Sequence, residues 1–371
     1  RLLLPVTLII SGCSIHHRPE AVVEPSGRAA DDMGRTEIDD ADADPSPGVE
    51  QSAAISAVTT GADAAEPPVA VRETLSTVEE ASDPDVPAQA AAPDRHPEFD
   101  RSAVAERALG KLCEQIGAKL GSVSERDCSA QNLAMTNGWS VQGRPIAFKL
   151  FSARDTHAGS LGRVLLIGGI HGDEYSSVSI CFRWMEFLQQ DQANTFEWLV
   201  VPLANPDGLL RKRSQRQNAR GVDLNRNFPS RDWDRLALAQ WRKRYAQNPR
   251  RYPGAYAASE PEVAWLQQQI ENFQPDVVIA IHAPYDLLDY DGPPTAPKKV
   301  GALDLRQLGV FPGSLGGYAG LDLSIPVVTI ELPHAGIMPS KSDIRSMWLD
   351  LVAWVRQQVT GLPAVALTSE R

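Results

Sequence analysis

Two histidines and a glutamate are spaced so that their side chains could bind one metal ion. His171 and Glu174 lie three residues apart in a turn that follows an apolar run ending in two glycines, and His282 ends a second apolar run at 277–281. Two imidazoles and one carboxylate make a tetrahedral zinc site that leaves the fourth position to water. We therefore expect His171, Glu174 and His282 to hold a single Zn²⁺ ion.

A further carboxylate is placed to act on that water. Glu331 ends the apolar run at 327–330, so we expect it beside the histidines, where it can serve as a general base. Asp173 is the alternative metal ligand in the first turn. A carboxylate in that position is expected instead to orient the turn or His171.

A loop at 223–228 adds donors for an anion. Its sequence is Asp-Leu-Asn-Arg-Asn-Phe, and Asn225 and Arg226 suit recognition of a carboxylate. Each feature alone is weak evidence, because a lone buried histidine is usually structural. Their order along the chain and their placement at strand ends together predict one catalytic site.

The chain from residue 101 onward alternates between strand and helix patterns. Continuous apolar runs between helices predict a mixed α/β sheet covered on both faces, with sites at the carboxyl ends of its strands. The segment at 259–262, Ser-Glu-Pro-Glu, has the spacing of a capping box at a helix start. We expect strands near 146–151, 163–169, 196–203, 276–281 and 325–332, and helices near 109–120, 175–190, 259–273 and 343–359.

Two longer strings carry a family resemblance. The chain reads Asn-Pro-Asp-Gly at 205–208 and Arg-Gln-Asn-Ala-Arg-Gly-Val-Asp-Leu-Asn-Arg-Asn-Phe-Pro at 216–229. With the two histidines and two glutamates above, these strings resemble the zinc metallocarboxypeptidases, and within them the bacterial murein peptide amidase A group. The segments 281–284, 313–316 and 330–333 are similar to further signatures of that group.

The resemblance covers about 135–360 and implies a carboxypeptidase-like fold, with a central mixed eight-stranded sheet flanked by helices. It implies that His171, Glu174 and His282 bind one Zn²⁺, and that Glu331 is first the general base and then the proton donor.

The resemblance also implies roles for the basic segment. Asn225 and Arg226 would hold the terminal carboxylate of the substrate, and Arg216 would stabilise the oxyanion, with Arg211 or Arg213 as alternatives. A tyrosine that closes over substrate in digestive relatives has no motif match, and the candidates for that role are Tyr318 and Tyr285.

The resemblance implies hydrolysis of the γ-D-glutamyl–meso-diaminopimelate amide in peptidoglycan-derived stem peptides. Three alternatives remain. One is a small-molecule N-acyl amino acid deacylase similar to aspartoacylase and succinylglutamate desuccinylase, and another is a general C-terminal protein carboxypeptidase. The third, an inactive cell-wall binding protein, should have lost a ligand or the base, and none is missing.

The charge of the chain is unevenly distributed. A hydrophobic content of 43% and eight Trp suffice for a core, and the net charge of −11 argues against a nucleic-acid partner. Residues 19–100 carry −16, with ten Pro and one aromatic side chain, which leaves +3 for 101–371 once the two N-terminal arginines are counted. We expect 14–100 to be a disordered acidic tether.

The first thirteen residues indicate export. An apolar run at 2–10 is too short to span a bilayer and suits a signal peptide. Ile-Ser-Gly-Cys at 10–13 resembles a lipoprotein box, which implies cleavage before Cys13 and its acylation. A lipid anchor on a membrane of the bacterial cell envelope, with the enzyme facing the periplasm, follows from this hypothesis. The alternative is an ordinary secretory signal with a chance Cys.

Export bears on the remaining cysteines. Cys113 and Cys128 flank a short stretch and could pair in an oxidising periplasm. Cys181 is expected as a buried small hydrophobe on a helix. The segment 101–138 is an N-terminal helical extension, either a cap over the site or a buttress, and 139–371 is the catalytic domain. Nothing in the sequence indicates an oligomeric state.

Overall fold

The computed structural model describes residues 101–154, 160–191, 194–293 and 295–361. The predicted signal segment with Cys13, and the predicted tether 14–100, lie outside the described residues.

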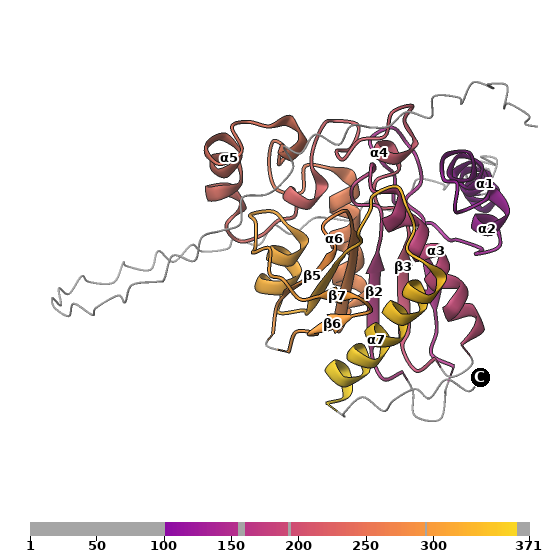
Figure 1. The fold of residues 1–371 in the computed structure, drawn as a ribbon. Coiled ribbons are helices and arrows are strands. Elements are labelled where there is room, and N and C mark those ends of the chain that lie inside the picture. Colours follow the sequence, from indigo (N-terminus) through magenta and orange to yellow (C-terminus); the bar gives the residue numbers. More distant parts are fainter. Residues whose placement is uncertain (1–100, 155–159, 192–193, 294, 362–371) are drawn as a thin grey trace, which may run out of the picture. The chain divides into compact units, whose positions relative to one another are not determined.

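A sheet of six strands forms the centre of the fold (Figure 1). Its order is β1-β3-β2-β4-β8-β5; β3, β2, β4 and β8 run parallel, and the two edge strands β1 and β5 are antiparallel to their neighbours. The parallel strands are buried on both faces, which explains their continuous apolar sequences. The strands are β1 (Lys149–Phe151), β2 (Arg163–Ile167), β3 (Glu197–Val201), β4 (Val277–His282), β5 (Leu287–Asp291) and β8 (Val327–Glu331).

Helices cover this sheet, and shorter elements connect it. The helices are α1 (Arg101–Lys119), α2 (Glu125–Ser129), α3 (Tyr175–Gln190), α4 (Pro206–Leu210), α5 (Trp233–Lys243), α6 (Pro261–Phe273) and α7 (Lys341–Thr360). The short elements are the 3₁₀ turns η2 (Leu224–Arg226) and η3 (Pro249–Arg251), the π-helical segment η4 (Gly316–Asp322), and a two-stranded ribbon of β6 (Lys299–Val300) and β7 (Leu303–Asp304).

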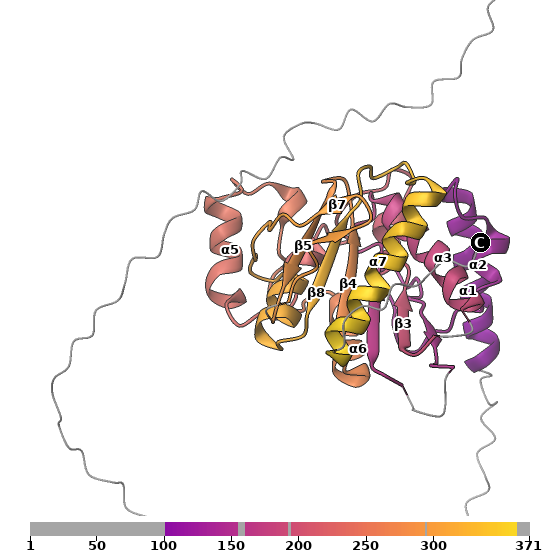
Figure 2. The same cartoon turned by 60° about the horizontal axis from the view of Figure 1, so that its bottom comes forward.

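The two faces of the sheet support separate apolar clusters. On one face, β-strand side chains such as Ile279 and Ile330 pack with α1, α3 and α7. On the other, side chains such as Ala280 and Val327 pack with α6 and η4. Figure 2 shows α7 lying across the sheet, with α1 and α2 near one edge and α5 beyond the other. This arrangement confirms the predicted α/β class with helices on both faces.

The prediction of eight strands in the sheet is not confirmed, because the described residues form six. The segment that precedes β1 pairs only through isolated antiparallel bridges, Ala134 with Phe148 and Trp139 with Pro145. Pro145 has no N–H group with which to extend a ladder. This stretch is therefore a loop that touches itself rather than an added pair of strands.

The predicted capping box at α6 does not form. Glu260 is the N-cap residue without a side-chain cap bond, and Ser259 donates to the Glu260 carboxylate. The buried Glu262 side chain instead accepts from the backbone N–H of Val141 and from Asn218. Long-range partners for Glu262 replace the local bond that the sequence spacing predicted.

The N-terminal extension packs against the body of the domain. Leu112 and Ile116 of α1 belong to the same buried cluster as side chains of α3, and Arg183 of α3 donates to the backbone oxygen of Ser122. Cys113 and Cys128 form a disulfide, with their Cα atoms 5.3 Å apart. The extension is thus a buttress on the α3 side. Among the described helices, none is long and apolar enough to cross a membrane.

Candidate active site

Three neighbouring strands deliver the predicted catalytic side chains to one edge of the sheet. β2 leads into the turn that holds His171, while His282 and Glu331 end β4 and β8 and are register partners. A Cβ atom at Gly172 would lie 2.1 Å from the backbone of Gly208. Glycine therefore lets this turn pack directly on α4, which brings His171 close to the loop at 216–226.

The predicted metal ligands converge in the structure. The Nδ1 atoms of His171 and His282 are 3.0 Å apart, and Glu174 places Oε1 2.7 Å from His171 Nδ1 and Oε2 3.1 Å from His282 Nδ1. All three residues are buried. Their ligand atoms lie within 4.8 Å of one another, a group that could hold a metal ion.

A carboxylate behind His171 sets the direction of its ring. His171 Nε2 lies 3.1 Å from Asp223 Oδ1, so an Nε2–H donated to Asp223 leaves the Nδ1 lone pair facing Glu174 and His282. Asp223 is fully buried and also accepts from Arg216 Nε at 2.9 Å. The sequence predicted that Asp173 would orient the turn or His171. The place of Asp223 at the start of the 223–228 motif was the available signal.

The charges of this centre compensate one another. Burial by itself would raise the pKa of Glu174, but the adjacent imidazoles outweigh it and hold that pKa far below its usual range. Burial also opposes ionisation of Asp223, yet Arg216 and His171 keep its pKa well below the ordinary value. Burial lowers the pKa of His282 despite the attraction of Glu174. Two imidazoles and a carboxylate are a donor set that suits Zn²⁺, so the residues fit this ion.

Glu331 lies buried next to the trio of predicted metal ligands, His171, Glu174 and His282. It is 6% exposed, and its Oε2 atom has no hydrogen-bond partner among the described residues. Burial first, and then repulsion from Glu174, raise the pKa of Glu331 well above its usual value, although Arg216 opposes them. A carboxylate with raised basicity and an open oxygen can take a proton.

The structure discriminates among the three candidate arginines. The Arg216 guanidinium is turned inward, with Nη1 3.6 Å from Glu174 and Nε 2.9 Å from Asp223. Arg211 and Arg213 are exposed on the loop that follows α4. Lys119 of α1 donates to the backbone oxygen of Arg211. Only Arg216 is therefore placed beside the metal ligands.

Asn225 and Arg226 lie in η2, immediately after Asp223. The side-chain oxygen of Asn225 accepts from the Leu315 N–H at 2.9 Å, which leaves its amide N–H groups for another partner. Arg226 is 6% exposed, stands 4.3 Å over the Phe311 ring and donates to the backbone oxygen of Asn225. Its Nε atom has no partner among the described residues, and burial lowers its pKa.

The two candidate tyrosines, Tyr318 and Tyr285, lie in different parts of the structure. Tyr318 stacks on Phe228, and its hydroxyl lies 3.5 Å from Glu271 of α6, away from the metal ligands. Burial raises the pKa of Tyr285, and Arg216 opposes this rise. The backbone of Tyr285 also hydrogen-bonds Glu331. Tyr285 is therefore the candidate tyrosine at the site.

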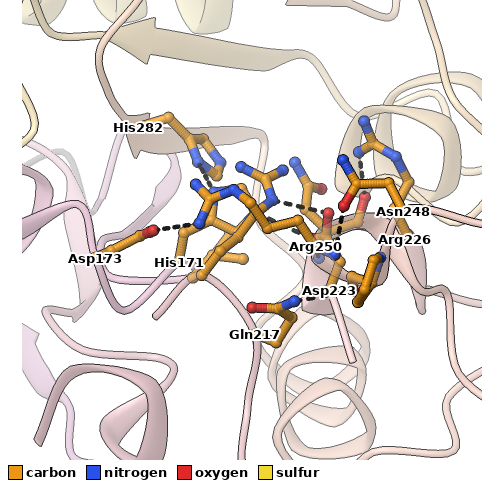
Figure 3. Close-up of polar contacts among 12 residues, drawn as sticks. His171, Asp173, Gln217, Asp223, Arg226, Asn248, Arg250 and His282 are labelled. Carbon is orange, nitrogen blue, oxygen red and sulfur yellow. Dashed lines mark hydrogen bonds and ion pairs between the residues drawn. The ribbon is translucent and has the colours of Figure 1, made fainter. Parts of the chain in front are cut away.

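Asp173 points away from His171 and pairs with an arginine. Its Oδ2 atom lies 2.7 Å from Arg250 Nη1 (Figure 3). Arg250 belongs to η3, where its N–H group donates to the Asn248 cap, and Gln217 donates to the backbone oxygen of Pro249. The Asp173 side chain therefore anchors η3 beside the metal ligands instead of orienting His171.

Asp289 and Asp291 of β5 line a cavity of about 300 Å³, and their side chains share a sheet face with Glu331. Directly opposed residues of antiparallel strands share a face, and Asp289 of β5 opposes Thr329, two residues before Glu331. Asp291 follows on the same face, and its burial together with repulsion from Asp289 raises its pKa to about 7. No cation among the described residues forms an ion pair with either aspartate. Sequence reasoning missed this pair.

Comparison with known proteins agrees with the geometry. A zinc carboxypeptidase family model matches residues 125–292. Murein peptide amidase A of Escherichia coli strain K12 is 30% identical over 205 residues, covering 53% of this chain and 79% of the relative. Murein peptide amidase A of Vibrio campbellii is 29% identical over 212 residues, covering 53% and 77%.

Among solved structures, carboxypeptidase A from Helicoverpa armigera superimposes with a TM-score of 0.51 at 18% identity, covering 67% of this chain and 80% of that one. This likeness concerns the fold. The extent of the match to the Escherichia coli relative, and a His–Glu–His group able to hold the metal, lead to one conclusion. The chain belongs to the zinc carboxypeptidase family and is a zinc-dependent hydrolase.

Proposed function

We propose that this enzyme hydrolyses the γ-D-glutamyl–meso-diaminopimelate amide of peptidoglycan-derived stem peptides. Similarity to murein peptide amidase A supports this substrate class. The structural observation that carries the proposal is the acid-lined cavity whose two aspartates share a sheet face with Glu331. The site at Arg226 suits a carboxylate, and the acidic cavity suits an ammonium group. Diaminopimelate as a leaving residue bears two carboxylates and an ammonium group on its side chain.

Glu331 is proposed as the general base. A zinc ion held by the trio would polarise the scissile carbonyl and lower the pKa of the attacking water. Glu331, with its raised pKa and open Oε2, accepts the proton of that water and then passes it to the leaving amine.

Arg216 is proposed to donate to the oxyanion that develops on the scissile carbonyl. Asp223 holds its Nε atom, so the Nη groups are fixed in direction before substrate arrives. Such preorganised donors stabilise a transition state without reorganisation at the moment of reaction.

Asn225 and Arg226 are proposed to bind the terminal carboxylate of the leaving residue. The open amide of Asn225 and the unpartnered Nε of Arg226 supply donors for it. Asp289 and Asp291 are proposed to bind the ammonium group of the diaminopimelate side chain. This group would supply the counter-charge that no described residue provides.

The test is hydrolysis of a defined panel by the zinc-loaded full chain. We expect release of diaminopimelate from L-alanyl-γ-D-glutamyl-diaminopimelate, followed by mass spectrometry, and slow turnover of the same peptide as its C-terminal amide. Cleavage confined to N-acyl aspartate or succinylglutamate would show a small-molecule deacylase instead.

A carboxypeptidase that removes C-terminal Lys or Arg from ordinary peptides is the second candidate. The acidic cavity also favours it, because either residue combines a terminal carboxylate with a cationic side chain. Peptides ending in Lys, Arg or Leu belong in the same panel. Preferential release of Lys or Arg, without release of diaminopimelate, would establish this second function.

We also propose that the enzyme is a lipoprotein of the cell envelope, anchored through Cys13. The sequence at 10–13 supports this proposal. Multiple acyl chains would give stable membrane attachment. Cys13→Ala is expected to move the protein from the membrane to the soluble fraction, and an unchanged membrane fraction would contradict the anchor.

A further inference from the structure

Arg251 is a buried cation without an anionic partner. Its side chain belongs to η3 and is 9% exposed. The guanidinium stands 5.1 Å over the ring of Tyr245 and hydrogen-bonds the side chain of Tyr285. Within the part of the chain that the structure describes, no carboxylate forms an ion pair with it.

This situation is costly for the folded protein. Burying a charged group without a counter-charge opposes folding, and an aromatic face offsets only part of the cost. The neighbouring arginines do not share the problem. Arg216 pairs with Asp223 and Glu174, and Arg250 pairs with Asp173. Two buried arginines near the site, Arg226 and Arg251, thus form no ion pair with a carboxylate of the described residues.

Aromatic rings flank both arginines, and the two guanidiniums are close enough to repel each other electrostatically. Arg226 lies 4.3 Å from the Phe311 ring, the Phe311 and Tyr245 rings are 6.5 Å apart, and Arg251 lies 5.1 Å from the Tyr245 ring. Arg226 borders the Asn225 amide, which faces Leu315. Arg251 hydrogen-bonds the side chain of Tyr285, which follows β4. The two guanidiniums thus have different hydrogen-bond partners, Asn225 for Arg226 and Tyr285 for Arg251.

Tyr285 connects Arg251 to the reacting centre. Its side chain contacts Arg251 and is within electrostatic range of Arg216 and Glu331. Its backbone hydrogen-bonds the Glu331 carboxylate. On the same side, Arg250 and Asp173 hold η3 against the turn of His171 and Glu174. A substrate group that reaches Arg251 would then sit beside the scissile carbonyl rather than in the acid-lined cavity.

We propose that Arg251 binds a second substrate carboxylate, one carried by the acyl residue that precedes the scissile bond. This inference rests on the proposed function, and it adds a requirement on the acyl half of the substrate. An amide formed through the γ-carboxyl of glutamate leaves the α-carboxylate free, close to the bond that breaks. Arg226 and Arg251 would thus each receive one carboxylate, the first from the leaving residue and the second from the acyl residue.

The test compares two tripeptides that differ at one group. One carries the free α-carboxylate of D-glutamate, and the other carries its α-carboxamide. We expect wild-type kcat/KM to favour the carboxylate by about tenfold to a hundredfold, the range of a hydrogen-bonded charge pair. Arg251→Met, which keeps the apolar stem, should bring this ratio close to one.

Controls separate this role from a structural one. Arg242→Met removes an exposed positive charge of α5 and should leave the carboxylate preference unchanged. Arg251→Lys should restore part of it. Zinc content and Tm are measured for every variant. An equal loss of kcat/KM on both tripeptides in Arg251→Met, with the preference retained, would overturn the inference.

The outcomes also separate this inference from the proposed function. Equal wild-type turnover of both tripeptides would refute the role of Arg251 and leave the amidase function standing. If neither tripeptide is cleaved, the proposed amidase function is refuted. Peptides ending in Lys, with Glu or Gln as the preceding residue, then provide the comparison of carboxylate with carboxamide. Calorimetric binding of L-alanyl-D-glutamate and L-alanyl-D-isoglutamine compares the carboxylate with the carboxamide without turnover. Equal wild-type affinity for the two would refute the inference.

Discussion

Charged groups at the metal centre are paired, whereas several charged groups around it have no ion-pair partner among the described residues. Around the trio each ionised group has a partner: Asp223 with His171 and Arg216, and Glu174 with both imidazoles. Farther out, Asp289 and Asp291 have no paired cation, and Arg226 and Arg251 have no paired carboxylate among the described residues. Closed networks keep ligands in place before the metal and substrate arrive. Open charges mark where a substrate can supply the partner.

The largest effect is expected at the boundary between these two regions, at Glu331. Glu331→Gln keeps the size of the side chain and leaves the trio intact, but removes the proton acceptor. We expect kcat to fall by about 10³, a typical contribution of a general base, with unchanged zinc content by elemental analysis. Retained turnover in a zinc-loaded variant would remove Glu331 from this role.

The closed network can be broken at Asp223. Asp223→Asn removes the charge that faces His171 and Arg216. Zinc affinity measured by chelator competition is expected to weaken by about tenfold to a hundredfold, as for other carboxylates behind a ligating histidine. Asp173→Asn is the matched control, because that carboxylate pairs with Arg250 instead. An equal loss of affinity in both variants would contradict the distinction.

The open region can be tested at the acidic cavity. Asp289→Asn with Asp291→Asn should raise KM for a leaving residue with an ammonium side chain by about tenfold, through loss of one charged hydrogen bond. For a leaving residue with an apolar side chain of equal length, KM should hardly change. A uniform rise in KM for both substrates would mean that the cavity shapes the fold rather than the specificity.

The smallest effect is a pH dependence. Because burial and Asp289 raise the pKa of Asp291 to about 7, its negative charge is complete only above that pH. KM for the ammonium substrate should therefore fall as pH rises through about 7, and Asp291→Asn should flatten this part of the profile. The same shift stabilises the fold fully below the ordinary value of 3.8, and that contribution is lost as pH rises through about 7. An unchanged profile in Asp291→Asn would contradict the role of this group.

Much of the framework could be predicted because its signals are local. The expected helix at 175–190 has the bounds of α3, and β4, β8 and α6 lie within or near the expected ranges. The apolar runs and glycines that predicted them act within a few residues. β5 was missed because its sequence, Leu-Leu-Asp-Tyr-Asp, has two acids. Those acids line the cavity that we propose as the ammonium site, so the residues that hid the strand are the ones to test.

The sequence by itself determined the chemistry available at the site. The identities and spacing of His171, Glu174, His282 and Glu331 indicated a metal-assisted hydrolase, because each residue type was needed and each followed an apolar strand.

Tertiary structure alone decided how the charges are paired. His171 contacts Asp223, which is 52 positions away in sequence, rather than Asp173, which is two positions away. Glu262 contacts Val141, which is 121 positions away. Such pairings depend on which loops the sheet brings together, and no local spacing encodes them. Within the described ranges, the same packing gives Asp289, Asp291 and Arg251 no ion-pair partner, and so decides where the substrate's own charges are expected to bind.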